Sequence, residues 1–171
     1  MKNTIAVFAS SRRNGNTGKF MDWIADELGI EVVDLAEKAI SPYDYDHTNI
    51  DDDFIPLMRK LLQYENIIFA TPVYWYGPSA QMKVFIDRTS DFLDVDALKD
   101  IGRQLRGKSA YVVCTSISEE ADNSFINAFR DTFNYLGMTW GGYAHANCVD
   151  GYQAELYQQS VNAFVDKFKA N

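Results

Sequence analysis

The segment at residues 5–17, IAVFASSRRNGNT, contains residue types that can hold a phosphate group. A short apolar run ends in a loop of hydroxyls, amides, a glycine and two arginines, and a helical pattern follows at once. The start of a helix supplies unpaired backbone N–H groups and the positive end of its dipole. Gly15 lets the backbone bend toward a ligand. The side-chain donors of the loop are Ser10, Ser11, Asn14, Asn16 and Thr17.

This first loop differs from the common nucleotide-binding loops. It has neither the GxxxxGK[ST] spacing of nucleoside triphosphatases nor the GxGxxG spacing of dinucleotide sites, so a monophosphate fits it better. The alternative is an ordinary turn in which Asn16 or Thr17 caps the helix. Capping needs one such residue, whereas five of the eight residues from 10 to 17 carry a hydroxyl or an amide. That excess favours the phosphate interpretation.

A second unusual loop, TPVYWYGP at residues 71–78, follows another apolar run. Its two prolines and Gly77 hold it in a defined shape. A rigid loop with free backbone N–H groups and flat side chains suits a planar heteroaromatic ligand, through stacking and hydrogen bonds to ring nitrogens and carbonyls. The alternative is that its rings cover the sheet edge or a subunit interface. The rings in question are Tyr74, Trp75 and Tyr76.

A third contributor is expected at the end of a later apolar run, at Thr115 and Ser116, with the loop at residues 117–123. The hydroxyls there could hydrogen-bond the edge of a ring. The alternative is an exposed loop with a helix cap at Asn123 or Ser124. Both interpretations stay open at this point.

These loops depend on the elements that position them, and the pattern alternates strands with helices. The expected strands are residues 4–9, 31–35, 66–70, 109–115 and 139–146. The expected helices are residues 17–28, 54–63, 79–92, 125–136 and 154–169, with an acidic connection at 40–53 and a polar one at 98–107.

Such alternation predicts an α/β fold, namely a flavodoxin-like doubly wound five-stranded parallel sheet of order 2-1-3-4-5 with helices on both faces. In this order strands one and three are neighbours at the point where the strand order reverses. Ligands bind there, beyond the carboxyl ends of the strands. The first two loops are therefore expected to meet in one crevice.

Composition excludes several classes of protein. A chain of 171 residues with 47% hydrophobic residues fits one globular domain, and its net charge of −8 disfavours binding to nucleic acid or anionic membranes. Its two cysteines have no CxxC spacing, which argues against an iron–sulfur or zinc site. No run of 18 apolar residues and no signal-peptide pattern is present, so we expect a cytoplasmic protein without membrane insertion.

Other candidate residues carry weaker signals. His47 lies in the acidic run at residues 44–53, which we interpret as a solvated loop rather than a metal site, and no metal is expected. His145 is either a packed residue or a group on the substrate side. Cys148 could act as a redox thiol if exposed, although no basic neighbour is evident to lower its pKa. Asp87 and Arg88 are expected to pair at a helix end or a subunit contact.

The two loops resemble those of the flavodoxin-like NAD(P)H-dependent FMN reductase family, with its quinone-reductase and iron–sulfur-flavoprotein branches. In that family GSxRxxGNT binds the FMN phosphate, and residues 9–17 here read ASSRRNGNT. The family motif TPxYxxxxSxxMKxFIDR lines the flavin, and residues 71–88 here read TPVYWYGPSAQMKVFIDR. Ala9 replaces the usual glycine, and the cluster cysteines of the iron–sulfur branch are absent. The first loop also differs from the TxTGxT loop of true flavodoxins, which argues against a pure electron carrier.

The resemblance implies a single flavodoxin-like FMN-binding domain over residues 1–171 and a set of cofactor contacts. The phosphate would be held by Ser10, Arg12, Asn14, Asn16 and Thr17. The isoalloxazine ring and ribityl chain would contact Pro72, Val73, Tyr74, Trp75 and Tyr76, with Thr115 and Ser116 as looser matches.

The resemblance also implies an activity. Hydride would pass from NADH or NADPH to FMN and on to a quinone, a nitro or azo compound, or free flavin. Because the flavin carries the redox chemistry, no catalytic acid, base or nucleophile is expected from the protein. Related proteins imply a homodimer or homotetramer. The competing interpretations are a non-enzymatic flavin electron carrier, which the acidic charge favours, and a phosphate-binding protein without flavin.

Overall fold

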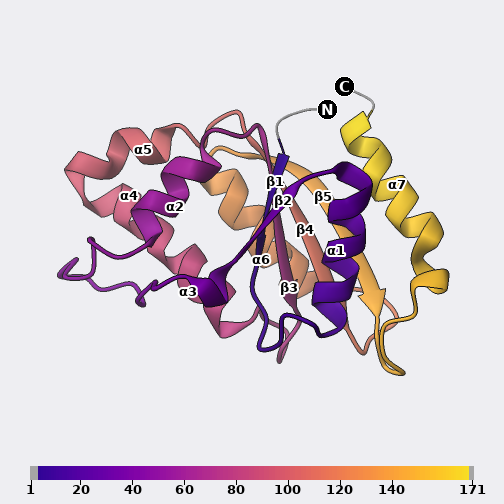
Figure 1. Cartoon of the computed structure of the whole chain (residues 1–171). Coiled ribbons are helices and arrows are strands. Elements are labelled where there is room, and N and C mark those ends of the chain that lie inside the picture. The colour runs from indigo at the N-terminus through magenta and orange to yellow at the C-terminus, as the bar shows by residue number, and fades with distance from the viewer. Residues whose placement is uncertain (1–3, 170–171) are drawn as a thin grey trace.

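The computed structural model describes residues 4–169, and a five-stranded sheet lies at its centre (Figure 1). Residues 1–3 and 170–171 of the expected domain lie outside the described residues. All strand pairs are parallel, and the order is β2-β1-β3-β4-β5. This confirms the predicted fold class. The strands are β1 Thr4–Phe8, β2 Glu31–Asp34, β3 Asn66–Pro72, β4 Ser109–Ser116 and β5 Thr139–Asn147.

Helices cover both faces of the sheet, as predicted (Figure 1). One face is covered by α1 and α7, and the other by α2 to α6. The α-helices are α1 Asn16–Leu28, α2 Phe54–Leu61, α3 Ala80–Asp87, α4 Asp91–Asp94, α5 Lys99–Arg103, α6 Asn123–Tyr135 and α7 Gln158–Lys169. Short 3-10 helices are η1 Leu35–Glu37, η2 Arg88–Ser90, η3 Asp96–Leu98 and η4 Ala154–Tyr157.

The core consists of two apolar layers separated by the sheet. Alternate residues of β4 enter opposite layers, so Val112 and Cys114 pack on the α6 side and Val113 packs on the α1 side. Every residue of β1 and β3 is buried, which is typical of parallel strands covered on both faces. These two rigid central strands carry the two loops that the sequence singled out.

The expected polar connection at residues 98–107 was wrong, because it contains α5. Leu98, Ile101 and Leu105 are buried at helical spacing. Gly102 lets this helix approach α4 closely, since a Cβ at that position would lie 2.5 Å from the Cβ of Phe92.

Two expected helices are also shorter than predicted. The helix expected at residues 79–92 ends at Asp87, and η2 and α4 follow it as separate turns. The helix expected at residues 154–169 begins as the 3-10 turn η4, and α7 starts at Gln158.

Candidate functional site

The carboxyl ends of β1, β3 and β4 open into a cleft of about 760 Å³. The loops after all three strands reach it, and the segment after β5 also contributes. All the residues that the sequence assigned to cofactor binding line this cleft except Asn14, which is exposed on the first loop. The lining residues are Ser10, Arg12, Gly15, Asn16, Thr17, Pro72, Val73, Tyr74, Trp75, Tyr76, Thr115, Ser116, Ile117, Ser118, Asp122 and Cys148.

Direct hydrogen bonds hold the loops of the cleft together. The buried hydroxyls of Thr17 and Thr115 are 2.6 Å apart, which joins the start of α1 to the end of β4. The hydroxyls of Ser11 and Tyr74 are 3.2 Å apart and join the first loop to the second. The predicted convergence of loops that are distant in sequence is therefore observed.

The start of α1 has free backbone donors. Gly15 is its N-cap, and no side chain caps the helix. The amide groups of Asn16, Thr17 and Gly18 have no acceptor within residues 4–169. The alternative that Asn16 or Thr17 caps this helix is therefore wrong, because Asn16 Oδ1 accepts from the amide of Tyr152 at 3.3 Å and Thr17 bonds to Thr115. Three N–H groups and the positive end of the helix dipole remain available to an anion.

The two arginines of the first loop differ in their partners. Arg13 forms a two-pronged ion pair with Asp22, at 2.9 and 2.5 Å, and lies over the ring of Phe8. The hydrogen bonds that Arg13 donates to Asp22 raise the pKa of Arg13. Arg12 lines the cleft and forms no hydrogen bond or ion pair through its guanidinium in the described part of the chain. The free positive charge of this loop therefore belongs to Arg12.

Gly18 allows the first loop to fold back over α1. A Cβ at this position would lie 1.7 Å from the carbonyl oxygen of Arg13, and the obstacle is backbone, which cannot swing aside. Any side chain there would push the loop off the helix start. The glycine therefore keeps the loop and the free amides close together.

The second loop is a tight hairpin at the mouth of the cleft. Tyr74 and Gly77 exchange two backbone hydrogen bonds, at 2.8 and 3.0 Å. The two residues between them, Trp75 and Tyr76, have φ values of 48° and 63°, as in a type I′ turn. This left-handed conformation costs roughly 1–2 kcal/mol for each bulky residue. Trp75 is nevertheless 96% exposed and Tyr76 69% exposed, so the strain holds two rings out at the cleft mouth.

Asp122 lines the cleft and lies in the loop at residues 117–123, which was expected from the sequence to contribute, although this residue was not singled out there. Asp122, rather than Asn123 or Ser124, caps α6 by accepting from the amides of Ser124 and Phe125. The hydrogen bond from Ser124 holds the pKa of Asp122 below its ordinary value, so this group is a carboxylate at neutral pH. The residue follows the carboxyl end of β4, and that position is the signal that could have identified it.

Cys148 lines the cleft as a buried, neutral thiol. Its side chain is 7% exposed, and burial raises its pKa. The condition for a redox thiol, exposure, is therefore not met.

Arg88 and Asp87 do not pair with each other, contrary to expectation. Arg88 is fully buried and forms ion pairs with Asp91 and Asp52. Asp87 pairs with Lys83 one turn back along α3. Neither residue lines the cleft.

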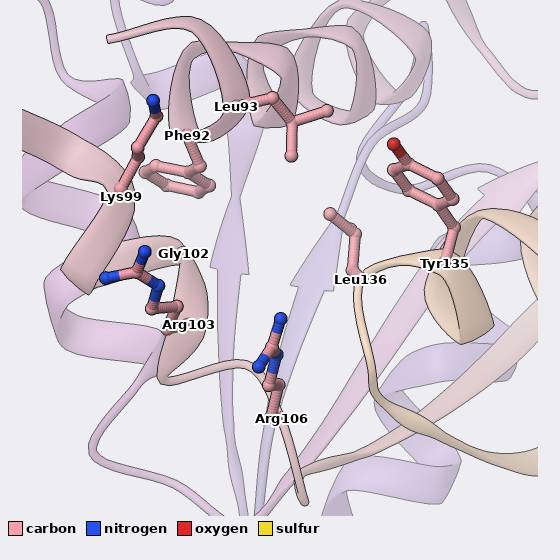
Figure 2. Close-up of a pocket in the computed structure, with 8 residues that line it drawn as sticks. All are labelled: Phe92, Leu93, Lys99, Gly102, Arg103, Arg106, Tyr135 and Leu136. Carbon is pink, nitrogen blue, oxygen red and sulfur yellow. The ribbon is translucent and has the colours of Figure 1, made fainter. Parts of the chain in front are cut away.

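A second, smaller cavity lies near the amino ends of β4 and β5, away from the carboxyl ends that form the cleft (Figure 2). Its volume is about 230 Å³, and its residues lie on α4, on α5, at the end of α6 and in the segment that precedes β4. Ligands of doubly wound sheets bind at the carboxyl ends of the strands. The position of this second cavity therefore argues against its being the main ligand site. The lining residues are Phe92, Leu93, Lys99, Gly102, Arg103, Arg106, Tyr135 and Leu136.

Comparison with known proteins identifies the family of this chain. The sequence profile of the NADPH-dependent FMN reductase family matches residues 3–146. The chain belongs to this family. A protein of Bacillus subtilis named as the NAD(P)H-dependent FMN-containing oxidoreductase YwqN is 32% identical over 81% of this chain and 82% of its own length. The iron-sulfur flavoprotein MJ1083 of Methanocaldococcus jannaschii is 30% identical over 67% of this chain and 62% of its own.

Solved structures of other proteins share the fold. The Trp repressor binding protein of Bacillus subtilis superposes with a TM-score of 0.71 at 26% identity, over 98% of both chains. An FMN-dependent NADH-azoreductase of Bacillus anthracis, solved with FMN, gives a TM-score of 0.69 at 11% identity, over 96% of both chains. The latter likeness concerns the fold alone.

Membership of the FMN reductase family confirms the sequence prediction of an FMN-dependent oxidoreductase that uses NAD(P)H. Within residues 4–169, no helix combines the length and the apolar character that crossing a membrane would require.

Proposed function

We propose that this chain transfers hydride from NADH or NADPH through FMN bound in the cleft to a small, flat, electron-poor acceptor. The proposed acceptors are a quinone, a nitro or azo compound, or free flavin. The observation that carries the proposal is that one cleft contains both a group of unpaired hydrogen-bond donors that can bind a phosphate and a rigid aromatic hairpin. These two ends match the two ends of FMN, an anionic tail and a planar ring.

The residues at the phosphate end fit a doubly charged anion. Arg12 supplies an unpaired guanidinium, and the start of α1 supplies the free amides of residues 16–18. Charge-assisted hydrogen bonds of this kind are the strong ones. Ser10 and Thr17 add hydroxyls, and Asn14 is the outermost donor that we propose for this group.

The residues at the ring end fit the isoalloxazine. We propose that the hairpin at residues 72–76 holds one side of the ring and that Thr115 and Ser116 lie at its edge. The amides of Trp75 and Tyr76 have no acceptor among the described residues, so they can donate to ring carbonyls or nitrogens. When bound, FMN accepts and passes on hydride. The free amides orient the ring and stabilise negative charge that develops at its edge.

The side chains at the mouth of the cleft suit a flat electron acceptor. Trp75, Tyr76 and Ile117 are large and largely exposed there, and rings of this kind suit stacking with planar molecules. An NADH-azoreductase and an NADPH-quinone reductase share this fold, which supports the proposed acceptor classes. We also propose a homodimer or homotetramer in which a second copy borders this exposed mouth, working in the cytoplasm where NADH and NADPH are held.

Anaerobic reduction of the FMN-loaded protein by NADH or NADPH alone tests the proposed function. We expect rapid loss of the visible flavin absorbance, followed by recovery of the absorbance when a quinone is added. A non-enzymatic electron carrier, which the net charge of −8 would suit, would keep its absorbance until a separate reductase is supplied. A protein that binds no added FMN would overturn the proposal.

A further inference from the structure

His145 lies between the cleft and a separate cavity. Its Nε2 is 2.8 Å from the hydroxyl of Ser116, which lines the cleft. The imidazole itself lines a side cavity of about 420 Å³ at the β5 edge of the sheet. The two cavities share no lining residue, so the bond between His145 and Ser116 connects them. The side cavity is lined by Glu119, Glu120, Ala121, Tyr143, Ala144, His145, Ser160, Ala163, Phe164 and Lys167.

The hydrogen bonds of Ser116 make its hydroxyl direction depend on this imidazole. The amide of Ser118 donates to Ser116 Oγ at 3.1 Å, which occupies one lone pair. If Nε2 of His145 carries a proton, it donates to the second lone pair, and the Ser116 hydrogen is free to point into the cleft. If Nε2 is bare, it accepts the Ser116 hydrogen and turns it away from the cleft. The protonation of Nε2 therefore determines whether the Ser116 hydroxyl can donate a hydrogen bond into the cleft.

The surroundings of His145 allow it to exchange protons with solvent. Its Nδ1 has no hydrogen-bond partner within residues 4–169, and exposed residues border the side cavity. The charged and titratable groups facing it are Glu119 and Glu120 from the loop after β4, Lys167 from α7 and Tyr143 from its own strand. Burial lowers the pKa of His145, and the charge of Glu120 opposes that shift.

We propose that His145 is a positioning residue that aims the Ser116 hydroxyl into the cleft and feeds it protons from the side cavity. This inference rests on the proposed function with a quinone as acceptor. Reduction of a quinone by NADH or NADPH takes one hydride and one further proton from solvent. A hydronium ion that reaches the side cavity protonates Nδ1 and leaves a water molecule, the Nε2–H proton passes to Ser116 Oγ, and the Ser116 O–H proton goes to the quinone oxygen. After the product leaves, a solvent proton that enters through the open cleft reaches Nε2 by way of Ser116, and Nδ1 releases its proton to solvent, which restores the Nε2–H form.

The kinetic test compares a proton-requiring acceptor with a proton-free one. His145→Ala, loaded with FMN, is expected to reduce a quinone about 100-fold more slowly, the scale of lost general acid catalysis. Its rate with ferricyanide, which takes electrons and no proton, is expected to match that of the parent protein. Imidazole in the buffer should enter the enlarged side cavity and restore quinone reduction. Equal losses with both acceptors, or no rescue by imidazole, would overturn the proposal.

A measurement without FMN separates this inference from the proposed function. His47 and His145 are the two histidines of the chain, so NMR can follow the titration of each in the FMN-free protein. Ser116→Ala is expected to shift the titration of His145 and leave that of His47 unchanged. Identical His145 titrations in both proteins would overturn the proposed bond.

The matched control is His47→Gln. This histidine contacts Asp91 at 3.0 Å and lines neither cavity, so its replacement is expected to leave quinone turnover and its pH dependence unchanged. A loss of quinone turnover in His47→Gln equal to that in His145→Ala would overturn the specific role of His145. Failure of NADH and NADPH to reduce the bound FMN would count against the proposed function alone.

Discussion

Arg12 and Arg88 carry the same side chain in opposite environments. Arg88 is fully buried, donates to Asp91 and Asp52 and to two backbone carbonyls of the preceding acidic loop, and lies over the ring of Phe54. Arg12 lies open in the cleft, and its guanidinium has no partner among residues 4–169. One guanidinium is satisfied by the protein, and the other is left for something that the protein binds.

This difference separates structural polar residues from binding residues. The Arg88 network ties the acidic loop at residues 41–52 to the end of α3, so removing its charge should affect folding. The cleft shows the reverse pattern, with free amides, an unpaired arginine and strained exposed rings. Groups of this second kind add little to stability and are expected to matter when ligand binds.

Arg88→Met is expected to produce the largest loss of stability. The substitution leaves Asp91 buried without its positive partner, and breaking a buried pair on one side costs about 3–5 kcal/mol. Urea unfolding of the FMN-free protein measures this loss. Arg130→Met is the matched control, because Arg130 pairs with Asp131 on the surface and such pairs contribute about 0–1 kcal/mol. Equal losses in the two variants would remove the distinction drawn for Arg88.

Replacing the strained turn is expected to raise stability and lower activity. The double variant Trp75→Asn with Tyr76→Gly places the residues that a type I′ turn prefers at the two left-handed positions. Relief of strain should stabilise the FMN-free protein by about 1–2 kcal/mol, as seen in urea unfolding. Quinone turnover should fall, because the exposed rings are gone. A variant that is less stable than the parent would show that these rings are held for packing instead.

Thr115→Val tests the bond between two loops of the cleft. Valine matches threonine in shape but leaves the hydroxyl of Thr17 buried without its partner, which costs about 1–3 kcal/mol. Urea unfolding of the FMN-free protein is the measurement. Thr132→Val, on the half-exposed side of α6, is the control and should change stability by less than about 0.5 kcal/mol. No difference between the two would mean that the loops do not depend on this contact.

The smallest effect concerns the thiols. Burial raises the pKa of Cys148, so the thiolate is scarce at neutral pH and appears only above the ordinary range of a free thiol. Alkylation by iodoacetamide is therefore expected to be slow at neutral pH, to accelerate as pH rises, and to slow again when FMN fills the cleft. Cys114, with its pKa raised to about 12, should not react in the folded protein. Fast alkylation of Cys148 at neutral pH, read by mass spectrometry, would contradict the buried position.

The sequence was sufficient for the fold because the pattern of strands is strong. The apolar runs of β1 and β3 are continuous, and the helices between strands leave few arrangements other than the observed order. The same order brings the loops after β1, β3 and β4 to one edge, so the cleft followed from topology and residue type together.

Other features depended on contacts that a local pattern does not contain. α5 was missed because Gly102 weakens its helical pattern, and the reason for that glycine is the ring of Phe92 on another helix. The bond between Thr17 and Thr115 joins residues that are distant in the chain. The two adjacent arginines of the first loop look alike in sequence. Arg13 is not available to a ligand because Asp22 on α1 forms an ion pair with it.

Titration of the FMN-free protein with FMN and with riboflavin, which lacks the phosphate, tests the central claim most directly. The parent protein should bind FMN far more tightly than riboflavin. Arg12→Met should weaken the affinity for FMN by about 10–100-fold, which is equivalent to about 1.5–3 kcal/mol for a charged hydrogen bond. The same substitution should leave the affinity for riboflavin and the stability in urea unchanged. If FMN and riboflavin bind the parent equally, or if Arg12→Met weakens both alike, the loop at residues 10–17 is not the phosphate site.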